Sequence, residues 1–425
     1  MTPADLTDPL LDATWKGFPP AAGALRRSVV GAQGWNVLGG DLPLPLAVVH
    51  RDALAHNLRW MQDLVARAGI DLAPHGKTTL SPQLFRAQLD AGAWGITVAS
   101  VGQVGLAVAS GARRVLIANQ VLQAVDLAAL AALRHAQPGL FAPFLLDSPA
   151  QLAAIEAWHT RAGGPPPDVL LELGLAGGRT GCRSDNDALT LARAARRSPA
   201  VRLVGIECYE GLWARGDDAA DTALVDPLLA RVHALAAQAE SEGLFEGNEV
   251  LVTAGGSAVF DLVARALRPA LRRPARALLR AGCYVTHDDG FYHRMGQVVN
   301  RRLGCVSGLQ AALRVWSMVL SMPEPGLAVL GAGKRDLSFD MGMPVPLAVS
   351  PAGTSTVQAA PAHWQIDALN DQHAYLRLGG DAAGLRVGDR VALGISHPCA
   401  TFDRWRWMAV VDDDLNVVDA ITTCF

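Results

Sequence analysis

A single lysine follows a short apolar segment in the stretch Ile70-Asp-Leu-Ala-Pro-His-Gly-Lys-Thr-Thr79. Residues 70–73 predict a buried strand, and a residue just past the C-terminal end of a parallel strand lies where barrel enzymes place their chemistry. The chain has only three lysines against 34 arginines. Arginine cannot replace an amine that must lose its proton and attack a carbonyl carbon. A surface lysine in an ordinary loop is the alternative, but the retained amine favours Lys77 as a catalytic residue.

Apolar runs alternate with longer amphipathic stretches on both sides of this lysine, from about residue 46 to 281. The predicted strands are residues 46–49, 71–74, 95–98, 115–118, 141–146, 169–173, 203–208, 249–253 and 277–280. The predicted helices include residues 52–68, 82–91, 148–162, 187–197 and 227–242, with Asp52 and Ser148 as caps and Pro82 just after Ser81. Such alternation implies a parallel sheet with right-handed crossovers.

These nine strands are one more than an eight-stranded barrel holds. They predict an α/β fold, a (β/α)8 TIM-like barrel, with the first strand donated to another domain. A doubly wound open sheet is the alternative, weakened because no G-x-G-x-x-G follows the first strand. After about residue 300 the helical periodicity fades, and residues 312–322, 327–330, 373–378 and 390–395 predict strands. We therefore expect an N-terminal extension (1–45) packing on a C-terminal all-β domain (301–425), with the barrel between them (46–300).

The composition excludes several classes of protein. The chain has 425 residues, half of them apolar, which allows one domain of roughly 250 residues and a smaller one. The net charge of −3 and the lack of a Lys/Arg run argue against a nucleic-acid partner. No 18-residue apolar run and no basic, apolar leader occur, so we expect no membrane span and no signal peptide. Six scattered cysteines without a C-x-x-C pair predict reduced thiols in a cytoplasmic protein.

A second candidate site is the run Ser396-His397-Pro398-Cys399. On an extended segment, residues two apart point to one face, so His397 and Cys399 would lie together. Imidazole and thiolate suit Zn²⁺, and two ligands fit an open site completed by water or substrate rather than a closed structural site. A buried His and a buried Cys near a turn are the alternative, which loses weight if Lys77 shares the same cleft.

Three further stretches follow predicted strands. Arg179, in a glycine-rich loop, could fix a carboxylate, a phosphate or a pyridine nitrogen. Tyr209 could lie flat against a planar ligand. The runs Thr253-Ala-Gly255-Gly256-Ser257 and Arg280-Ala-Gly282-Cys-Tyr284 could offer a nest of backbone N–H groups to a phosphate. Ordinary loops and a barrel-rim Tyr remain the alternatives for each. Together with Lys77, these residues form the inventory for pyridoxal 5'-phosphate (PLP).

The chain resembles the D-serine dehydratase / D-threonine aldolase family of fold-type III PLP enzymes, the alanine-racemase-like barrels, from about residue 44 onward. The resemblance is carried by Pro74-His75-Gly76-Lys77-Thr78, Gly92-Ala-Trp-Gly-Ile-Thr-Val-Ala99, Gly178-Arg-Thr-Gly181, Tyr209-Glu-Gly211, Gly255-Gly-Ser257 and His397-Pro-Cys399. It implies that Lys77 forms the internal aldimine and that His397 and Cys399 hold a divalent metal, zinc or alternatively manganese. The residues expected at the cofactor are His75, Arg179, Tyr209, Thr253, Gly255, Gly256, Ser257, Gly282 and Tyr284.

The resemblance also implies an activity, that of a metal-dependent lyase acting on small D-3-hydroxy amino acids, in a homodimer. Lys77 would take the α proton and the metal would help the β-hydroxyl leave, giving a 2-oxo acid and ammonia. A thiolate ligand at Cys399 favours such a dehydratase over an aldolase, in which His287 or His293 could be the base. Residues 212–215 depart from the family pattern, where a His is expected soon after Gly211. A PLP carrier protein and a metal-dependent barrel hydrolase are the remaining alternatives.

Overall fold

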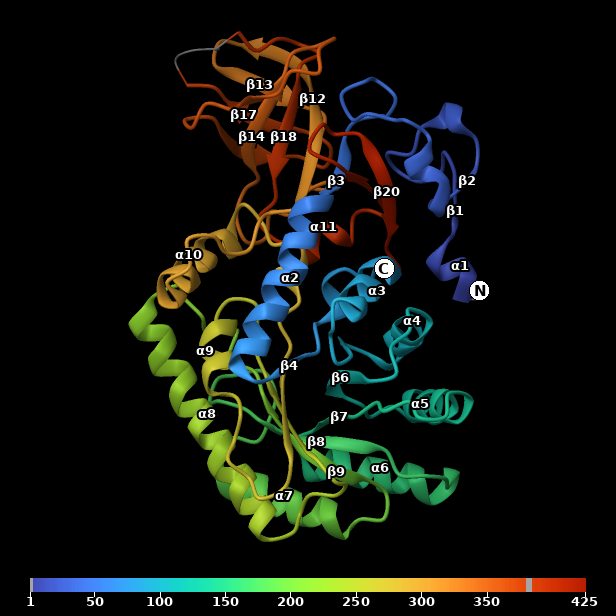
Figure 1. Ribbon diagram of the computed structural model, residues 1–425, viewed down its shortest axis with the longest axis vertical. Coiled ribbons are helices and arrows are strands. Elements are labelled where there is room, and N and C mark those ends of the chain that lie inside the picture. Colours follow the sequence, from blue (N-terminus) through green and yellow to red (C-terminus); the bar gives the residue numbers. More distant parts are fainter. Residues whose placement is uncertain (1–2, 380–383) are drawn as a thin grey trace.

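Eight parallel strands form the barrel of the computed structural model, which describes residues 3–379 and 384–425 (Figure 1). The strands are β4 (Asp71–Leu72), β5 (Ile96–Val98), β6 (Val115–Gln120), β7 (Phe144–Leu146), β8 (Asp168–Leu173), β9 (Arg202–Cys208), β10 (Val250–Ala254) and β11 (Ala275–Leu279). Their order is β4-β11-β10-β9-β8-β7-β6-β5. A parallel bridge between His75 and Thr97 joins the two ends of this order, so the sheet closes beside Lys77. The barrel prediction is confirmed, and the open sheet is excluded.

Amphipathic helices follow the strands and cover the outside of the barrel. They are α2 (Arg51–Ala68), α3 (Pro82–Asp90), α4 (Val104–Ala109), α5 (Ala124–Ala136), α6 (Pro149–Ala162), α7 (Asp185–Arg197), α8 (Asp218–Ser241), α9 (Phe260–Ala266) and α10 (Phe291–Leu303). Ser81 and Ser148 cap α3 and α6 by accepting hydrogen bonds from backbone N–H groups. These caps and the proline positions that follow them explain why both helices begin where the sequence predicts.

Two predicted helix starts are wrong. Asp52 is no cap, because α2 already begins at Arg51 and Asp52 lies in its first turn. Residue 227 is not the start of α8, which begins at Asp218 after the Asp217 cap and carries Pro227 in its interior. A proline removes one helical hydrogen bond. Burial of residues such as Val225 and Leu228 on either side of Pro227 holds the helix together across the gap.

A mainly antiparallel sheet forms the second unit and takes the first strand of the α/β region. The strand β3 (Leu46–His50) pairs with β12 and β19, not with the barrel, as the strand count predicts. The other strands of the sheet are β12 (Leu313–Glu324), β13 (Leu327–Leu330), β14 (Val345–Ser350), β15 (Gln358–Ala359), β16 (Gln365–Leu369), β17 (Ala374–Arg377), β18 (Arg390–Gly394), β19 (Trp407–Val411) and β20 (Val417–Thr422). The C-terminal all-β prediction is confirmed.

The N-terminal segment lies against this sheet, at its outer edge in Figure 1. It contains α1 (Pro3–Thr7), β1 (Leu10–Leu11) and β2 (Leu25–Arg26). Leu11, Phe18 and Val30 are buried in one apolar cluster with Trp316 and Trp407 of the β domain. This burial removes apolar surface from water and so fixes the extension on the sheet.

Within residues 3–379 and 384–425, no helix is both long and apolar enough to span a bilayer.

Candidate active site

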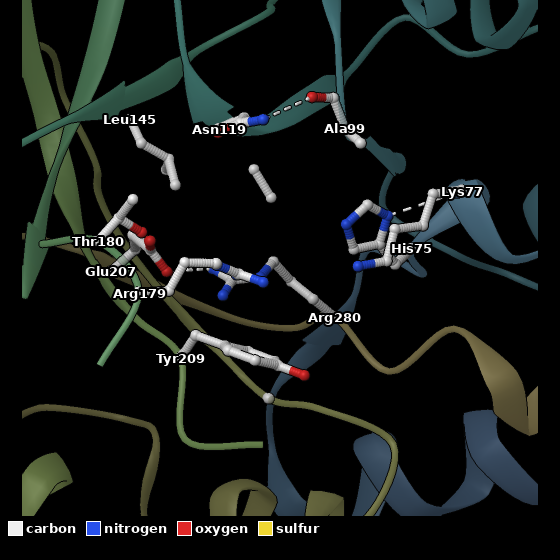
Figure 2. A pocket seen from close by; sticks show the side chains of 12 residues that line it. His75, Lys77, Ala99, Asn119, Leu145, Arg179, Thr180, Glu207, Tyr209 and Arg280 are labelled. Carbon is white, nitrogen blue, oxygen red and sulfur yellow. Dashed lines mark hydrogen bonds and ion pairs between the residues drawn. The ribbon is translucent and has the colours of Figure 1, made fainter. Parts of the chain in front are cut away.

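A cavity of about 160 Å³ opens at the C-terminal end of the barrel strands, where Lys77 was expected to lie (Figure 2). It is lined by His75, Lys77, Ala99, Ala118, Asn119, Leu145, Arg179, Thr180, Glu207, Tyr209, Gly255 and Arg280. Five predicted site residues are therefore brought together from four separate loops. The cavity combines an amine, an imidazole, two guanidinium groups and one aromatic face, which suits a planar anionic ligand.

The turn that presents Lys77 depends on its neighbours. The 3-10 helix η3 (Gly76–Thr78) follows β4, and the His75 Nδ1 accepts a hydrogen bond from the Lys77 N–H at 3.4 Å. A Cβ on Gly76 would lie 2.4 Å from Phe85 Cζ, so only glycine fits this turn. Loss of bulk water lowers the pKa of the Lys77 amine, and nearby Cys399 opposes that shift. A lowered pKa makes the amine a better nucleophile and base near neutral pH.

Arg179 and Tyr209 form one wall of the cavity. The Arg179 guanidinium lies 5.1 Å from the centroid of the Tyr209 ring, within the range of a cation–π contact. The Arg183 guanidinium holds the loop below, donating to the carbonyls of Gly178 and Gly181 at 2.8 Å each. Burial raises the pKa of the Tyr209 phenol to about 12, so the ring stays neutral at physiological pH. The wall thus offers a fixed cation beside an aromatic face.

Two buried carboxylates at the barrel's inner wall were missed from the sequence. Glu207 lies 2.7 Å from Arg280, and both side chains are almost fully buried. Glu172 instead accepts hydrogen bonds from Thr180 Oγ1 at 2.5 Å and from the Gln120 amide. Burial, and then the charge of Glu207, raises the pKa of Glu172 to about 8. The available signal was the pattern of an acid at an inward position near the end of each of two apolar strands.

Glu172 makes the stability of the fold depend on pH. Its folded-state pKa of about 8 lies above its ordinary value of 4.5, so its contribution is complete below about pH 4.5 and is lost as pH rises through 8. When the pH rises from 5 to 9, the unfolding free energy of the wild type should fall more than that of Glu172→Gln. The difference should be on the order of a few kcal/mol. Denaturant unfolding at several pH values measures this difference. The exposed Glu324→Gln is the matched control, and parallel wild-type and Glu172→Gln curves would contradict the argument.

The predicted phosphate corner is arranged differently from the expectation. The backbone N–H groups of Gly255 and Gly256 do not form an open nest, because both donate to the buried carboxylate of Glu210, at 3.2 and 2.6 Å. The Ser257 hydroxyl accepts from the Gly282 and Cys283 N–H groups at 3.2 and 3.1 Å. Both acceptor positions of Ser257 are thus used, which leaves its O–H free to donate to a ligand.

Two further residues expected at the phosphate face elsewhere. The Tyr284 hydroxyl accepts from Gln88 of α3 at 3.2 Å, and the side chain is buried in the core. Thr253 donates to the Leu278 carbonyl at 2.9 Å inside the barrel. Neither lines the cavity. A hydroxyl group can bind a phosphate, but the hydroxyls of Tyr284 and Thr253 form hydrogen bonds inside the packed barrel instead.

His397 and Cys399 lie on a turn, and the extended conformation expected for them is wrong. Pro398 has a helical backbone conformation, and Cys399 begins the short helix α11 (Cys399–Phe402). Proline is favoured at the start of a helix, and α11 packs against η3. The Cys399 Sγ lies 3.5 Å from Thr78 Oγ1, next to Lys77 in sequence. Thr78 and Cys399, 321 residues apart in the chain, therefore meet, which brings the Lys77 turn and the second candidate site together.

The side chains of His397 and Cys399 suit a metal ion that keeps open coordination positions for water or substrate. The His397 Nδ1 lies 2.6 Å from the Asp340 carboxylate, which leaves Nε2 as the ring nitrogen for a ligand bond. The hydrogen bond from Cys283 and the nearby charge of Lys77 lower the pKa of the Cys399 thiol to about 7, despite its burial. Over the described part of the chain, no three His, Cys, Asp or Glu side chains form a ready metal cage. Two protein ligands plus water or substrate remain the arrangement that fits.

The bases considered for the alternative reaction lie outside the cavity. His287 is buried with φ +49°, and burial lowers the pKa of its ring to about 3. His293 sits on the exposed side of α10, with its ring 3.1 Å from Gln297. Neither ring lines the cavity around Lys77.

Comparison with known proteins agrees with this architecture. Residues 49–282, more than half of the chain, match the family model "Alanine racemase, N-terminal domain", and residues 312–411 match "Putative serine dehydratase domain". The chain is 28% identical over 357 residues to a D-threonine aldolase from Arthrobacter sp., covering 84% of this chain and 86% of that protein.

Two further proteins are similar over most of their length. The D-threo-3-hydroxyaspartate dehydratase of Delftia sp. (strain HT23) is 28% identical over 386 residues, covering 85% of this chain and 92% of that protein. The crystal structure of a D-threonine aldolase from Filomicrobium marinum superposes with a TM-score of 0.77 at 24% identity, covering 92% of this chain and 97% of that one. The protein belongs to the D-serine dehydratase / D-threonine aldolase family of fold-type III PLP enzymes, with an alanine-racemase-like barrel.

Proposed function

We propose that this protein is a PLP- and metal-dependent lyase that removes the β-hydroxyl of small D-3-hydroxy amino acids and yields a 2-oxo acid and ammonia. The observation that carries the proposal is the meeting of Cys399 with the Lys77 turn, 3.5 Å from Thr78 Oγ1. A base for the α proton and a metal for the β-oxygen must act on adjacent carbons, so they must share one site. D-Serine, D-threonine and 3-hydroxy-D-aspartate are the candidate substrates.

The residues around the cavity fit the cofactor that the family implies. Lys77 would hold it through its amine, Arg179 and Tyr209 would bound its ring, and the Ser257 O–H would donate to its phosphate. Gly282 lets its loop pass close to the Lys77 turn, because a Cβ at this position would lie 2.5 Å from the His75 carbonyl oxygen. Bound PLP supplies an electron sink for negative charge at Cα.

The residues of the chain divide the remaining work. Burial keeps the pKa of His75 well below its usual range, so the ring next to Lys77 is neutral. Because the His75 ring is neutral, it does not repel the ammonium group that Lys77 becomes when its amine takes the α proton. His397, oriented by Asp340, and Cys399 would hold the divalent metal, for which we propose zinc. A bound divalent metal supplies Lewis acidity toward the β-hydroxyl.

Retro-aldol cleavage is the second candidate, because one relative is named a D-threonine aldolase and another a dehydratase at equal identity. Cleavage needs a base aimed at the β-hydroxyl while its oxygen stays on Cβ. His287 and His293, the two bases considered from the sequence, lie away from the cavity. The thiolate ligand proposed at Cys399, beside the Lys77 turn, supports elimination.

D-Threonine separates the two reactions, because elimination gives 2-oxobutanoate and ammonia while cleavage gives glycine and acetaldehyde. We expect 2-oxobutanoate and ammonia as the main products, formed in equal amounts by the purified enzyme. L-Threonine is the matched control for the configuration. Glycine and acetaldehyde released faster than ammonia would overturn the proposal in favour of the aldolase.

A further inference from the structure

Two thiols meet beside the proposed metal pair. The Cys283 Sγ lies 3.6 Å from the Cys399 Sγ, although 116 residues separate them in the chain. The Thr78 Oγ1 contacts both sulfurs, at 3.5 Å from Cys399 and 3.8 Å from Cys283. The proposed function uses Cys399 as a metal ligand and leaves the Cys283 thiol without a role.

The two thiols differ in access to solvent. Cys283 is 3% exposed, and its backbone N–H is held by Ser257 at 3.1 Å, at the start of η5 (Cys283–Val285). Cys399 is partly exposed at the start of α11. A disulfide requires a sulfur separation of about 2.0 Å, so the sulfurs need to approach by about 1.6 Å. Both cysteines stand at the first position of a short helical turn, η5 and α11.

We propose that Cys283 and Cys399 form a reversible disulfide when a peroxide reaches the site, and that this bond withdraws the thiolate that holds the metal. Cys399 is the nucleophile because it is the more exposed of the two residues, and Cys283 is the resolving thiol. The consequence for the metal rests on the proposed function, whereas formation of the bond does not.

The chemistry balances with hydrogen peroxide as the oxidant. The Cys399 thiolate attacks one peroxide oxygen: an S–O bond forms, the O–O bond breaks, and the leaving hydroxide takes up the thiol proton as water. The Cys283 sulfur then attacks the Cys399 sulfur: an S–S bond forms, the S–O bond breaks, and hydroxide leaves with the Cys283 proton as a second water. The two thiols lose two electrons, which reduce the peroxide to two waters. A dithiol reverses the bond by exchange.

The alternative to a disulfide is a metal bridge, in which both sulfurs bind one metal ion. It would make His397, Cys399 and Cys283 a three-ligand group. Among residues 3–379 and 384–425, no group of three such side chains is placed to hold a metal. The geometry therefore favours the disulfide over the bridge.

The test treats purified holoenzyme with hydrogen peroxide, blocks the remaining thiols, and digests without reduction for mass spectrometry. We expect a cross-linked peptide pair containing Cys283 and Cys399, loss of two of the six free thiols, release of the bound metal, and recovery with dithiothreitol. Cys283→Ser should give no cross-link, and its Cys399 should oxidise further to the sulfinic acid without recovery. The exposed Cys424→Ser is the control and should behave as wild type.

Three results would count against parts of this inference. Wild-type Cys399 reaching the sulfinic acid without any cross-link overturns the disulfide. Joint protection of both thiols by metal, with no cross-link after metal removal, overturns it in favour of the bridge. A cross-link that forms without release of metal supports the disulfide and contradicts the role of Cys399 as a metal ligand.

Discussion

Lys77→Ala is expected to lose all covalently bound cofactor and to reduce turnover by about 10²–10⁴-fold or more, the contribution of a positioned acid–base group. The reason is that the cavity presents a single amine, on a turn that only glycine at position 76 permits. Borohydride treatment of the wild-type protein should attach the cofactor irreversibly to the peptide that contains Lys77. The same treatment of Lys77→Ala should leave the protein unlabelled.

The scarcity of lysine gives this prediction a clean control. The other two lysines are Lys16, which pairs with Asp336, and Lys334, on the surface of the β domain. Lys334→Ala should keep both the label and the turnover of the wild type. If Lys77→Ala still traps the cofactor covalently, the assignment of Lys77 is wrong.

Cys399→Ala is expected to lose the metal and most of the activity while it keeps the visible absorbance of bound PLP. The thiolate is one of only two proposed protein ligands, so its removal leaves His397 alone, and a single imidazole does not hold zinc firmly. Loss of Lewis-acid assistance worth several kcal/mol corresponds to a fall in turnover on the order of 10³-fold. Metal content by elemental analysis and the PLP absorbance measure the two effects separately.

The control for this variant is Cys305→Ala, which removes a thiol of similar exposure away from the cavity. It should retain metal, absorbance and turnover. Full turnover of Cys399→Ala in a demonstrably metal-free preparation would exclude a metal at this pair.

The barrel could be predicted because its strands are short, continuous apolar runs between amphipathic segments. Runs such as Val-Leu-Leu-Glu-Leu (169–173) are buried on both sides, as a parallel sheet requires. The β domain was predicted less completely, because the sequence did not predict β14, β15, β16, β19 or β20. The strand β16 shows why, since Gln365–Leu369 reads as a mixed polar segment whose Ile366 and Leu369 alone are buried.

The site was predictable where a residue acts through its own type and position. Lys77, Arg179 and Tyr209 follow strands and reach the cavity by that route. Pairings between distant residues were not predictable, because only the fold brings the partners together. Glu210 takes the Gly255 and Gly256 amides, Asp340 orients His397, and Cys283 meets Cys399.

The most direct test of the account is a crystal structure of the holoenzyme with anomalous diffraction at the metal's absorption edge. Electron density should continue from Lys77 Nζ into the cofactor. One anomalous peak should lie about 2.0–2.1 Å from a His397 ring nitrogen and about 2.3 Å from Cys399 Sγ, the distances of zinc. A cofactor unattached to Lys77, or a metal bound away from His397 and Cys399, would contradict it.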